Sequence, residues 1–165
     1  MAKSKFFGYV LRNAGTPCQQ WVSNELPVST VTVFTSSTTS SVATSGTIPL
    51  SSVTLNQFGG RINSDGSFSL PCGLYKIEFS LIPSTAAAGV AIISLNAGST
   101  TLFTSEVSTA ADGVNGTISG SIAGDTVIRS TGCNINFALV NSSTVAITPV
   151  MAGTESVRVI ITKIA

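Results

Sequence analysis

Single-residue alternation of apolar and polar side chains is the feature that most restricts how this chain can fold. The clearest run is residues 75–81 (Tyr-Lys-Ile-Glu-Phe-Ser-Leu), and shorter runs cover 31–33, 68–70, 135–139 and 157–161. Side chains on a β-strand point alternately to opposite faces, so this period predicts strands with one buried face. No eleven-residue window has a convincing helical period with charged outer positions. The sequence therefore predicts an all-β chain.

Turn-forming pairs separate these runs at short intervals. Examples are Asp65-Gly66, Ala97-Gly98, Asp112-Gly113, Gly124-Asp125 and Ala152-Gly153. Many short strands at a spacing of about 8–12 residues indicate a sandwich, a jelly roll or a barrel. A length of 165 residues suits one such domain.

The chain divides into two parts of different character. Residues 1–45 begin with a basic, aromatic stretch and continue into the Ser/Thr-rich run 35–41. That run could be a linker, an exposed loop or a polar first strand. We therefore expect an N-terminal arm over 1–45, with a linker or the first strands, and a regular β-rich body over 46–165.

Charge and composition argue against catalysis. Histidine is absent, which removes the commonest general base and the commonest metal ligand. The seven acidic residues are scattered, and a calcium site built from Asp65, Asp112 or Asp125 is disfavoured. We expect no enzyme activity, no cofactor and no metal. A net charge of +1 also disfavours nucleic acid as a partner and lowers the barrier to self-association.

The three cysteines are Cys18, Cys72 and Cys133. A bridge between Cys72 and Cys133 is one option, while the odd number and wide spacing favour reduced, buried thiols. The apolar run 6–11 is too short to span a membrane and lacks a clean cleavage site, so we expect it to be retained and no membrane to be a partner.

Several phrases resemble one family. Residues 65–77 read Asp-Gly-Ser-Phe-Ser-Leu-Pro-Cys-Gly-Leu-Tyr-Lys-Ile, and residues 92–98, 120–127 and 156–165 follow with further family-like phrases. Together they resemble the complement/tumour-necrosis-factor-like trimeric jelly-roll superfamily in its bacterial and phage type, which includes exosporium fibre heads. The resemblance covers about 46–165. It implies an all-β antiparallel jelly-roll sandwich of about ten strands that packs as a homotrimer.

The resemblance also implies that apolar strand faces meet around a threefold axis. The last strand is apolar on both faces at Ile160 and Ile161, so one face needs a further cover. That cover could be a loop of the same chain or a neighbouring copy. The residues that we expect at the oligomer interface are Tyr75, Ile77, Phe79, Val159, Ile160, Ile161 and Ile164.

The arm is not explained by the family. Its large apolar side chains are flanked by Lys3, Lys5 and Arg12, which are too few cations for strong binding to a nucleic-acid backbone. Anchoring to a groove on a partner protein is favoured over a first strand of the body. The expected capsid-anchoring residues are Phe6, Phe7, Tyr9, Leu11 and Trp21.

These observations predict a virion structural protein of a phage: a capsid decoration, head-fibre or spike subunit at the particle surface. Its arm would bind a capsid or other virion protein. One alternative is a receptor-binding or adhesin tip that recognises a host glycan through loops 84–90, 108–117 and 141–153. Another is a single jelly-roll capsid or penton protein. A bacterial or spore surface is the alternative location.

Overall fold

The computed structural model describes residues 30–85, 89–109, 117–118, 120–131 and 135–164. Every regular element in these ranges is a β-strand, which confirms the predicted fold class. No helix among them is long and apolar enough to cross a membrane. The strands are β1 (Thr30–Ser36), β2 (Ser52–Asn56), β3 (Arg61–Ile62), β4 (Phe68–Ser69), β5 (Gly73–Thr85), β6 (Gly89–Ala97), β7 (Thr100–Thr109), β8 (Thr117–Ile118), β9 (Ile122–Ser130), β10 (Asn136–Asn141), β11 (Ile147–Val150) and β12 (Val157–Lys163).

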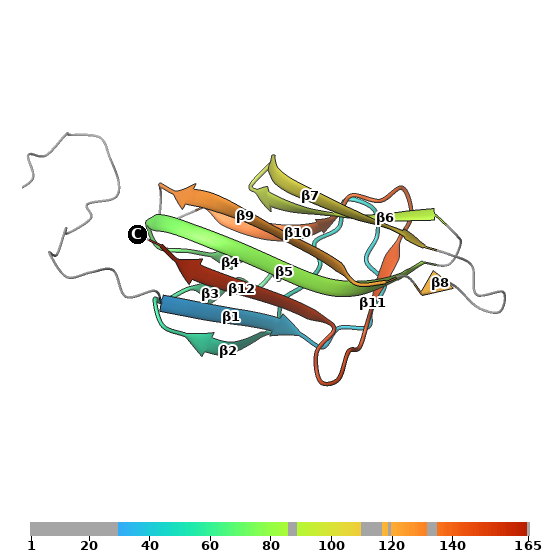
Figure 1. Ribbon diagram of the computed structural model, residues 1–165, viewed down its shortest axis with the longest axis horizontal. Helices are drawn as coiled ribbons and strands as arrows, with labels where there is room; N and C mark the ends of the chain where they lie inside the picture. Colours follow the sequence, from blue (N-terminus) through green and yellow to red (C-terminus); the bar gives the residue numbers. More distant parts are fainter. Residues whose placement is uncertain (1–29, 86–88, 110–116, 119, 132–134, 165) are drawn as a thin grey trace, which may run out of the picture.

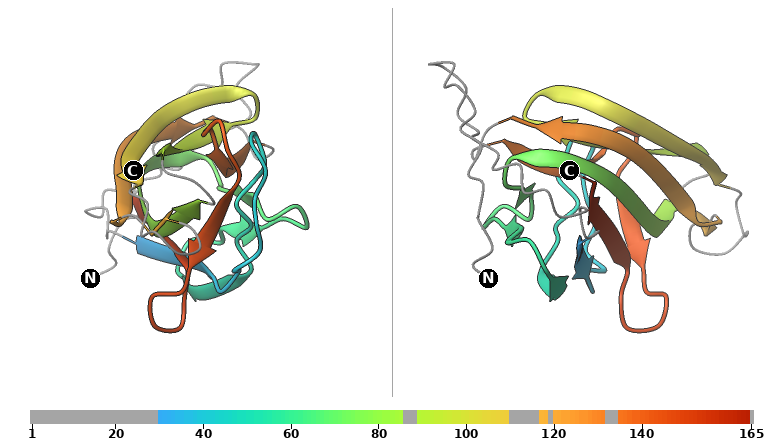
Figure 2. Two further views of the ribbon diagram at one scale, coloured as in Figure 1. Left: turned by 90° about the vertical axis from the view of Figure 1, so that its right-hand side faces the viewer. Right: turned by 60° about the vertical axis from the view of Figure 1, so that its left-hand side comes forward.

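The strands form two antiparallel sheets that face each other (Figures 1 and 2). The first, called sheet A here, runs β9-β5-β12-β1-β2, with β8 and β11 pairing the far end of β5. The second, called sheet B here, runs β3-β4-β10-β6-β7. Strands distant in sequence lie side by side, as β1 does with β12. This crossing order is that of a jelly roll.

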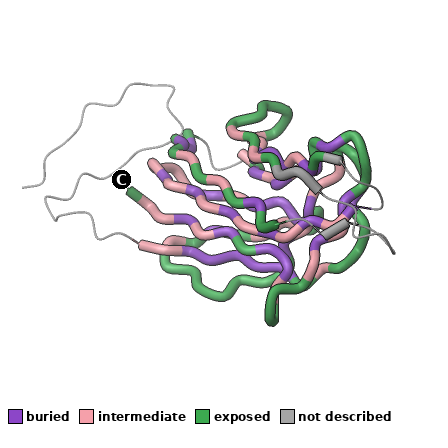
Figure 3. Tube along the Cα trace, turned by 45° about the vertical axis from the view of Figure 1, so that its right-hand side comes forward, coloured by how far each residue is buried: buried purple, intermediate pink, exposed green. Residues whose placement is uncertain are grey.

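The longest predicted alternation, at 75–81, lies in β5 at the centre of sheet A. Residues of one parity along this strand are buried and those of the other parity are half-buried, and Figure 3 shows the same alternation along β12. The inward residues of both sheets form one apolar core. Its largest fully buried side chains are Tyr75, Phe34, Phe68, Phe137, Ile48, Leu70, Ile77, Ile93, Leu95, Ile122, Leu139 and Ile147.

The jelly roll begins within the region expected to be the arm. β1 lies between β12 and β2, and Phe34 is fully buried against Phe68, with ring centroids 5.6 Å apart. Further along, Val42 is buried and its backbone pairs with Ile147. The body therefore starts at Thr30 rather than at residue 46, and the Ser/Thr-rich run 35–41 is the end of β1 and the loop after it. The strand alternative therefore holds for residues 35 and 36 and the loop alternative for residues 37–41.

A tight turn and a buried tyrosine lead into β5. Gly66 has a φ of 80°, and an added Cβ would lie 2.5 Å from the Cα of Pro49, so the turn requires glycine. The Asp65 carboxylate accepts hydrogen bonds from the hydroxyl and the backbone N–H of Ser67, which lower the pKa of Asp65. Asp65 therefore stabilises the turn through its hydrogen bonds to Ser67.

The Tyr75 hydroxyl donates a 2.9 Å hydrogen bond to the Pro71 carbonyl, while its ring lies in the core. Burial raises the pKa of Tyr75 to about 12. We expect Tyr75→Phe to lower the free energy of unfolding by about 1 kcal/mol, because the fold is kept and one partly buried hydrogen bond is lost. Urea unfolding of both proteins measures this difference. An unchanged midpoint would show that the bond contributes nothing to stability.

Asn141 connects three segments at the end of β10. It is fully buried, and its side-chain amide donates to the carbonyls of Val42 at 3.0 Å and Val145 at 2.9 Å. Its Oδ1 accepts from the backbone N–H of Ser143 at 3.0 Å. A single amide therefore holds the loop after β1 and the loop after β10 to the sheet.

The expectation of a reduced thiol is wrong for Cys72, which is disulfide-bonded. Cys18 and Cys133 lie outside the described residues. Cys72 directly precedes Gly73, which pairs with Ser130 at the end of β9. The bridge is therefore made where β5 begins and β9 ends.

Candidate functional site

The outer face of sheet A, which points away from the core, is the candidate site. Antiparallel pairing aligns its outward side chains in rows across four strands. In the central row, Asp125 of β9 lies opposite Glu78 of β5. Glu78 lies opposite Ile160 of β12, which in turn lies opposite Val33 of β1. We call this surface the A face; its outward residues are Val31, Val33, Leu74, Lys76, Glu78, Ser80, Ala123, Asp125, Val127, Arg129, Arg158, Ile160 and Thr162.

Charged and apolar groups lie side by side on the A face. Two carboxylates directly opposite each other repel, and Glu78 and Asp125 are such a pair. The Lys76 ammonium is 3.0 Å from Glu78 Oε1 and 3.8 Å from Asp125 Oδ2. The hydrogen bond to Glu78, reinforced by both negative charges, raises the pKa of Lys76. Val127, opposite Lys76, is 57% exposed, the largest exposed fraction among the large apolar residues described.

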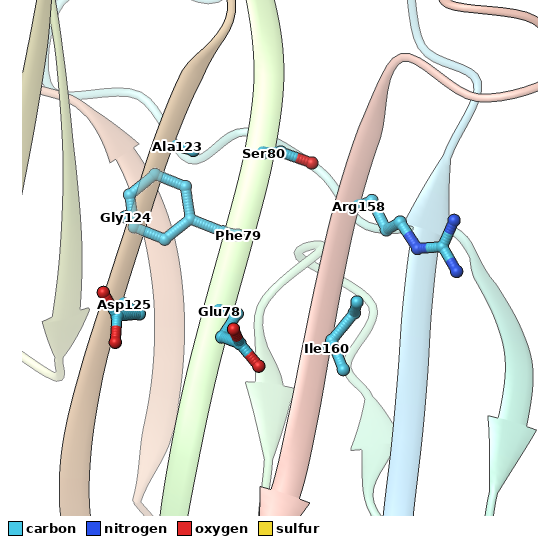
Figure 4. Close-up of a pocket in the computed structure, with 8 residues that line it drawn as sticks. All are labelled: Glu78, Phe79, Ser80, Ala123, Gly124, Asp125, Arg158 and Ile160. Carbon is cyan, nitrogen blue, oxygen red and sulfur yellow. The ribbon is translucent and has the colours of Figure 1, made fainter.

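A shallow hollow of about 330 Å³ lies at the centre of the A face. Figure 4 shows Glu78 and Asp125 on neighbouring strands at one side of it and Arg158 and Ile160 at the other. Among the described residues, no three histidine, cysteine or acidic side chains gather as a metal ion would need. The hollow offers two carboxylates, a guanidinium and an apolar wall, which suits contact with another protein surface.

Gly124, which lines this hollow, leaves room on the inner side of β9 for two aromatic rings. An added Cβ would lie 2.8 Å from Cε1 and Cζ of Phe79 and would collide with Phe103 of β7. The two rings pack edge to face with centroids 6.2 Å apart. Glycine at this position therefore lets a side chain from each sheet meet where the edge strands β7 and β9 come together.

The structure places most of the predicted interface residues in the core. Five of the seven are at most 3% exposed: Tyr75, Ile77, Phe79, Val159 and Ile161. A side chain without accessible surface has none to lose on association, so these five stabilise the single chain. Ile160 is half-buried on the A face, and Ile164 is 40% exposed just after β12.

The predicted anchoring residues Phe6, Phe7, Tyr9, Leu11 and Trp21 lie outside the described residues.

Val127 was missed by sequence reasoning, although it ends the phrase 120–127. Its signal was its parity with Asp125 on the strand, opposite to that of the buried Ile128.

No family model and no curated protein matches this sequence. Solved structures do match. Eiger TNF from S. frugiperda is 11% identical with a TM-score of 0.60, covering 83% of this chain and 93% of Eiger. Murine APRIL is 12% identical with a TM-score of 0.58, covering 83% of this chain and all of APRIL. At this identity the similarity is one of fold, and it confirms a jelly roll of the tumour-necrosis-factor type for this chain.

Proposed function

We propose that this chain is a non-enzymatic structural subunit that forms a homotrimer through the A face. The observation that carries the proposal is the apolar surface that a solitary chain leaves on this face, where Val127 of β9 is more than half exposed and Ile160 of β12, on the other side of β5, is half-buried. Exposed apolar surface on a β-sheet is stabilised when a neighbour covers it. A net charge of +1 adds little repulsion between copies. The fold shared with Eiger TNF and APRIL supports a trimer in particular.

We further propose that the trimer decorates a virion, with the residues before Thr30 as its attachment to a capsid protein. The support is the basic and aromatic sequence of that segment, together with described strands of the jelly roll that begin at Thr30. Deleting residues 1–21 should leave self-association unchanged and abolish co-sedimentation with particles. Full co-sedimentation of the truncated protein would overturn the attachment role.

The trimer itself is tested by Ile160→Asp. The new carboxylate would lie opposite Glu78 on the A face, so association would have to bury two neighbouring like charges. We expect light scattering to give three times the 16.8 kDa chain mass for the wild type and a mass near that of one chain for the variant at micromolar concentration.

Ile92→Asp is the matched control. Ile92 is also a half-buried isoleucine on an outer sheet face, and it also lies opposite a glutamate, Glu106, but it belongs to sheet B. This variant should keep the wild-type mass. A single-chain mass for the wild type would end the trimer proposal, and a mass of five chains would favour a penton-like assembly.

A further inference from the structure

A second apolar surface lies at one edge of the sandwich, between the edge strands β7 and β9. It is a groove of about 300 Å³, called the edge groove here, lined chiefly by Leu102, Val127, Ile128, Ile135 and Phe137. Leu102 is 37% exposed, whereas Phe137 belongs to the core, so the groove leads from the surface to the inside of the sandwich. Arg129 is its one charged lining residue, so an occupant would be held mainly by apolar contacts.

The edge groove lies at the end of sheet A where β1 begins. Thr30, the first residue of β1, pairs with Lys163, and Lys163 pairs with Tyr75. Tyr75 in turn pairs with Ile128 in the groove. Thr30 and Ile128 therefore share one row of the sheet, three strand spacings or about 14 Å apart.

The chain before Thr30 contains a segment of suitable chemistry and reach. Residues 6–11 (Phe-Phe-Gly-Tyr-Val-Leu) form the most apolar run of the first 29 residues. The eighteen residues 12–29 join this run to Thr30, and a chain of that length can extend to about 60 Å, so the run can reach the groove. A tethered segment that can reach its site has an effective concentration well above that of a second copy at micromolar concentration.

We propose that the edge groove is the docking site of residues 6–11 of the same chain. The apolar side chains of the segment cover Leu102 at the surface end of the groove. The inference does not need the trimer or particle attachment, because it rests on the groove, the segment and the tether; Val127, which also belongs to the A face, is not required for it.

Amide hydrogen exchange of the full chain tests this docking. We expect the amides of residues 6–11 to exchange at least about tenfold more slowly than in a synthetic peptide of residues 1–21. Leu102→Glu places a charge in the groove at an already exposed position and should remove the protection. Val90→Glu is the matched control, because Val90 is 43% exposed on β6 and does not line the groove, and it should keep the protection.

Whether the docked segment comes from the same chain or from a neighbouring copy is tested in the Ile160→Asp variant, which is expected to be monomeric. Protection that persists there comes from the same chain. Loss of protection in that background would assign the contact to a neighbouring copy and overturn the proposal. Exchange of residues 6–11 at the peptide's rate in the wild type, or equal protection in the Leu102→Glu and Val90→Glu variants, would overturn it as well.

Discussion

Replacing Asn141 by alanine should lower the free energy of unfolding by about 3–5 kcal/mol. The substitution leaves the buried Ser143 N–H without its partner, and an unsatisfied buried polar group costs about 1–3 kcal/mol. The part-buried hydrogen bond to the Val145 carbonyl is lost as well, which costs about 1 kcal/mol. A small cavity adds to this loss. The Val42 carbonyl is less affected, because it also accepts from the N–H of Ile147. Urea unfolding at a fixed protein concentration measures the change.

Asn136→Ala on the same strand is the control for this prediction. Asn136 is exposed, and its side chain accepts a 3.0 Å hydrogen bond from the Ser69 hydroxyl. Its loss should cost less than about 1 kcal/mol, since water can replace the bond. Equal losses for the two variants would show that Asn141 is not the centre that joins the two loops to the sheet.

Gly124→Ala should destabilise the protein by about 3 kcal/mol, at the upper end of what overpacking usually costs. The methyl group collides with Phe103 and lies 2.8 Å from Phe79, and the two rings hold each other in place. Gly120→Ala is the control, because no atom lies within 4 Å of its added Cβ. We expect thermal unfolding to show a clearly lower midpoint for Gly124→Ala and a small change for Gly120→Ala.

A second substitution tests the cause of that loss. Phe103→Leu removes one of the two rings, so the double variant Gly124→Ala/Phe103→Leu should be more stable than the sum of the two single losses predicts. Strictly additive losses would contradict a collision with Phe103 as the cause.

The alternation of residue types predicted the fold well but not the exposed face. Period two in 75–81 located the longest strand and divided its side chains into two sets. Apolar residues make up one set, and all of them are buried within the chain. The expectation that Tyr75, Ile77 and Phe79 also contact a partner overlooked that their surface is already covered by the core. The A face belongs to the other set, where Lys76 and Glu78 look like an ordinary solvated surface until the register places Ile160 and Val127 beside them.

Long-range pairing also explains why the start of the body was misplaced. The segment 30–45 is uncharged and rich in serine and threonine, which is typical of linkers as well as of strands. Phe34 and Val42 lie beside strands more than a hundred residues later in the chain, and Phe34 also packs against Phe68. Local sequence carries no signal for such a partner. The disulfide at Cys72 likewise could not be predicted from local sequence, because a bridge depends on which residues the fold brings together.

β12 separates β5 from β1 in sheet A, which has a consequence for biosynthesis. A ribosome releases β1 long before β12, so β1 has no partner for its β12 edge until synthesis is nearly complete. Closure of the sandwich therefore comes late and is slow, because it depends on a long-range strand pair. Ile160 and Arg158 arrive with that same final strand. A prematurely terminated polypeptide would thus lack the middle of the surface proposed for assembly, and we would expect only chains that include β12 to enter the proposed trimer.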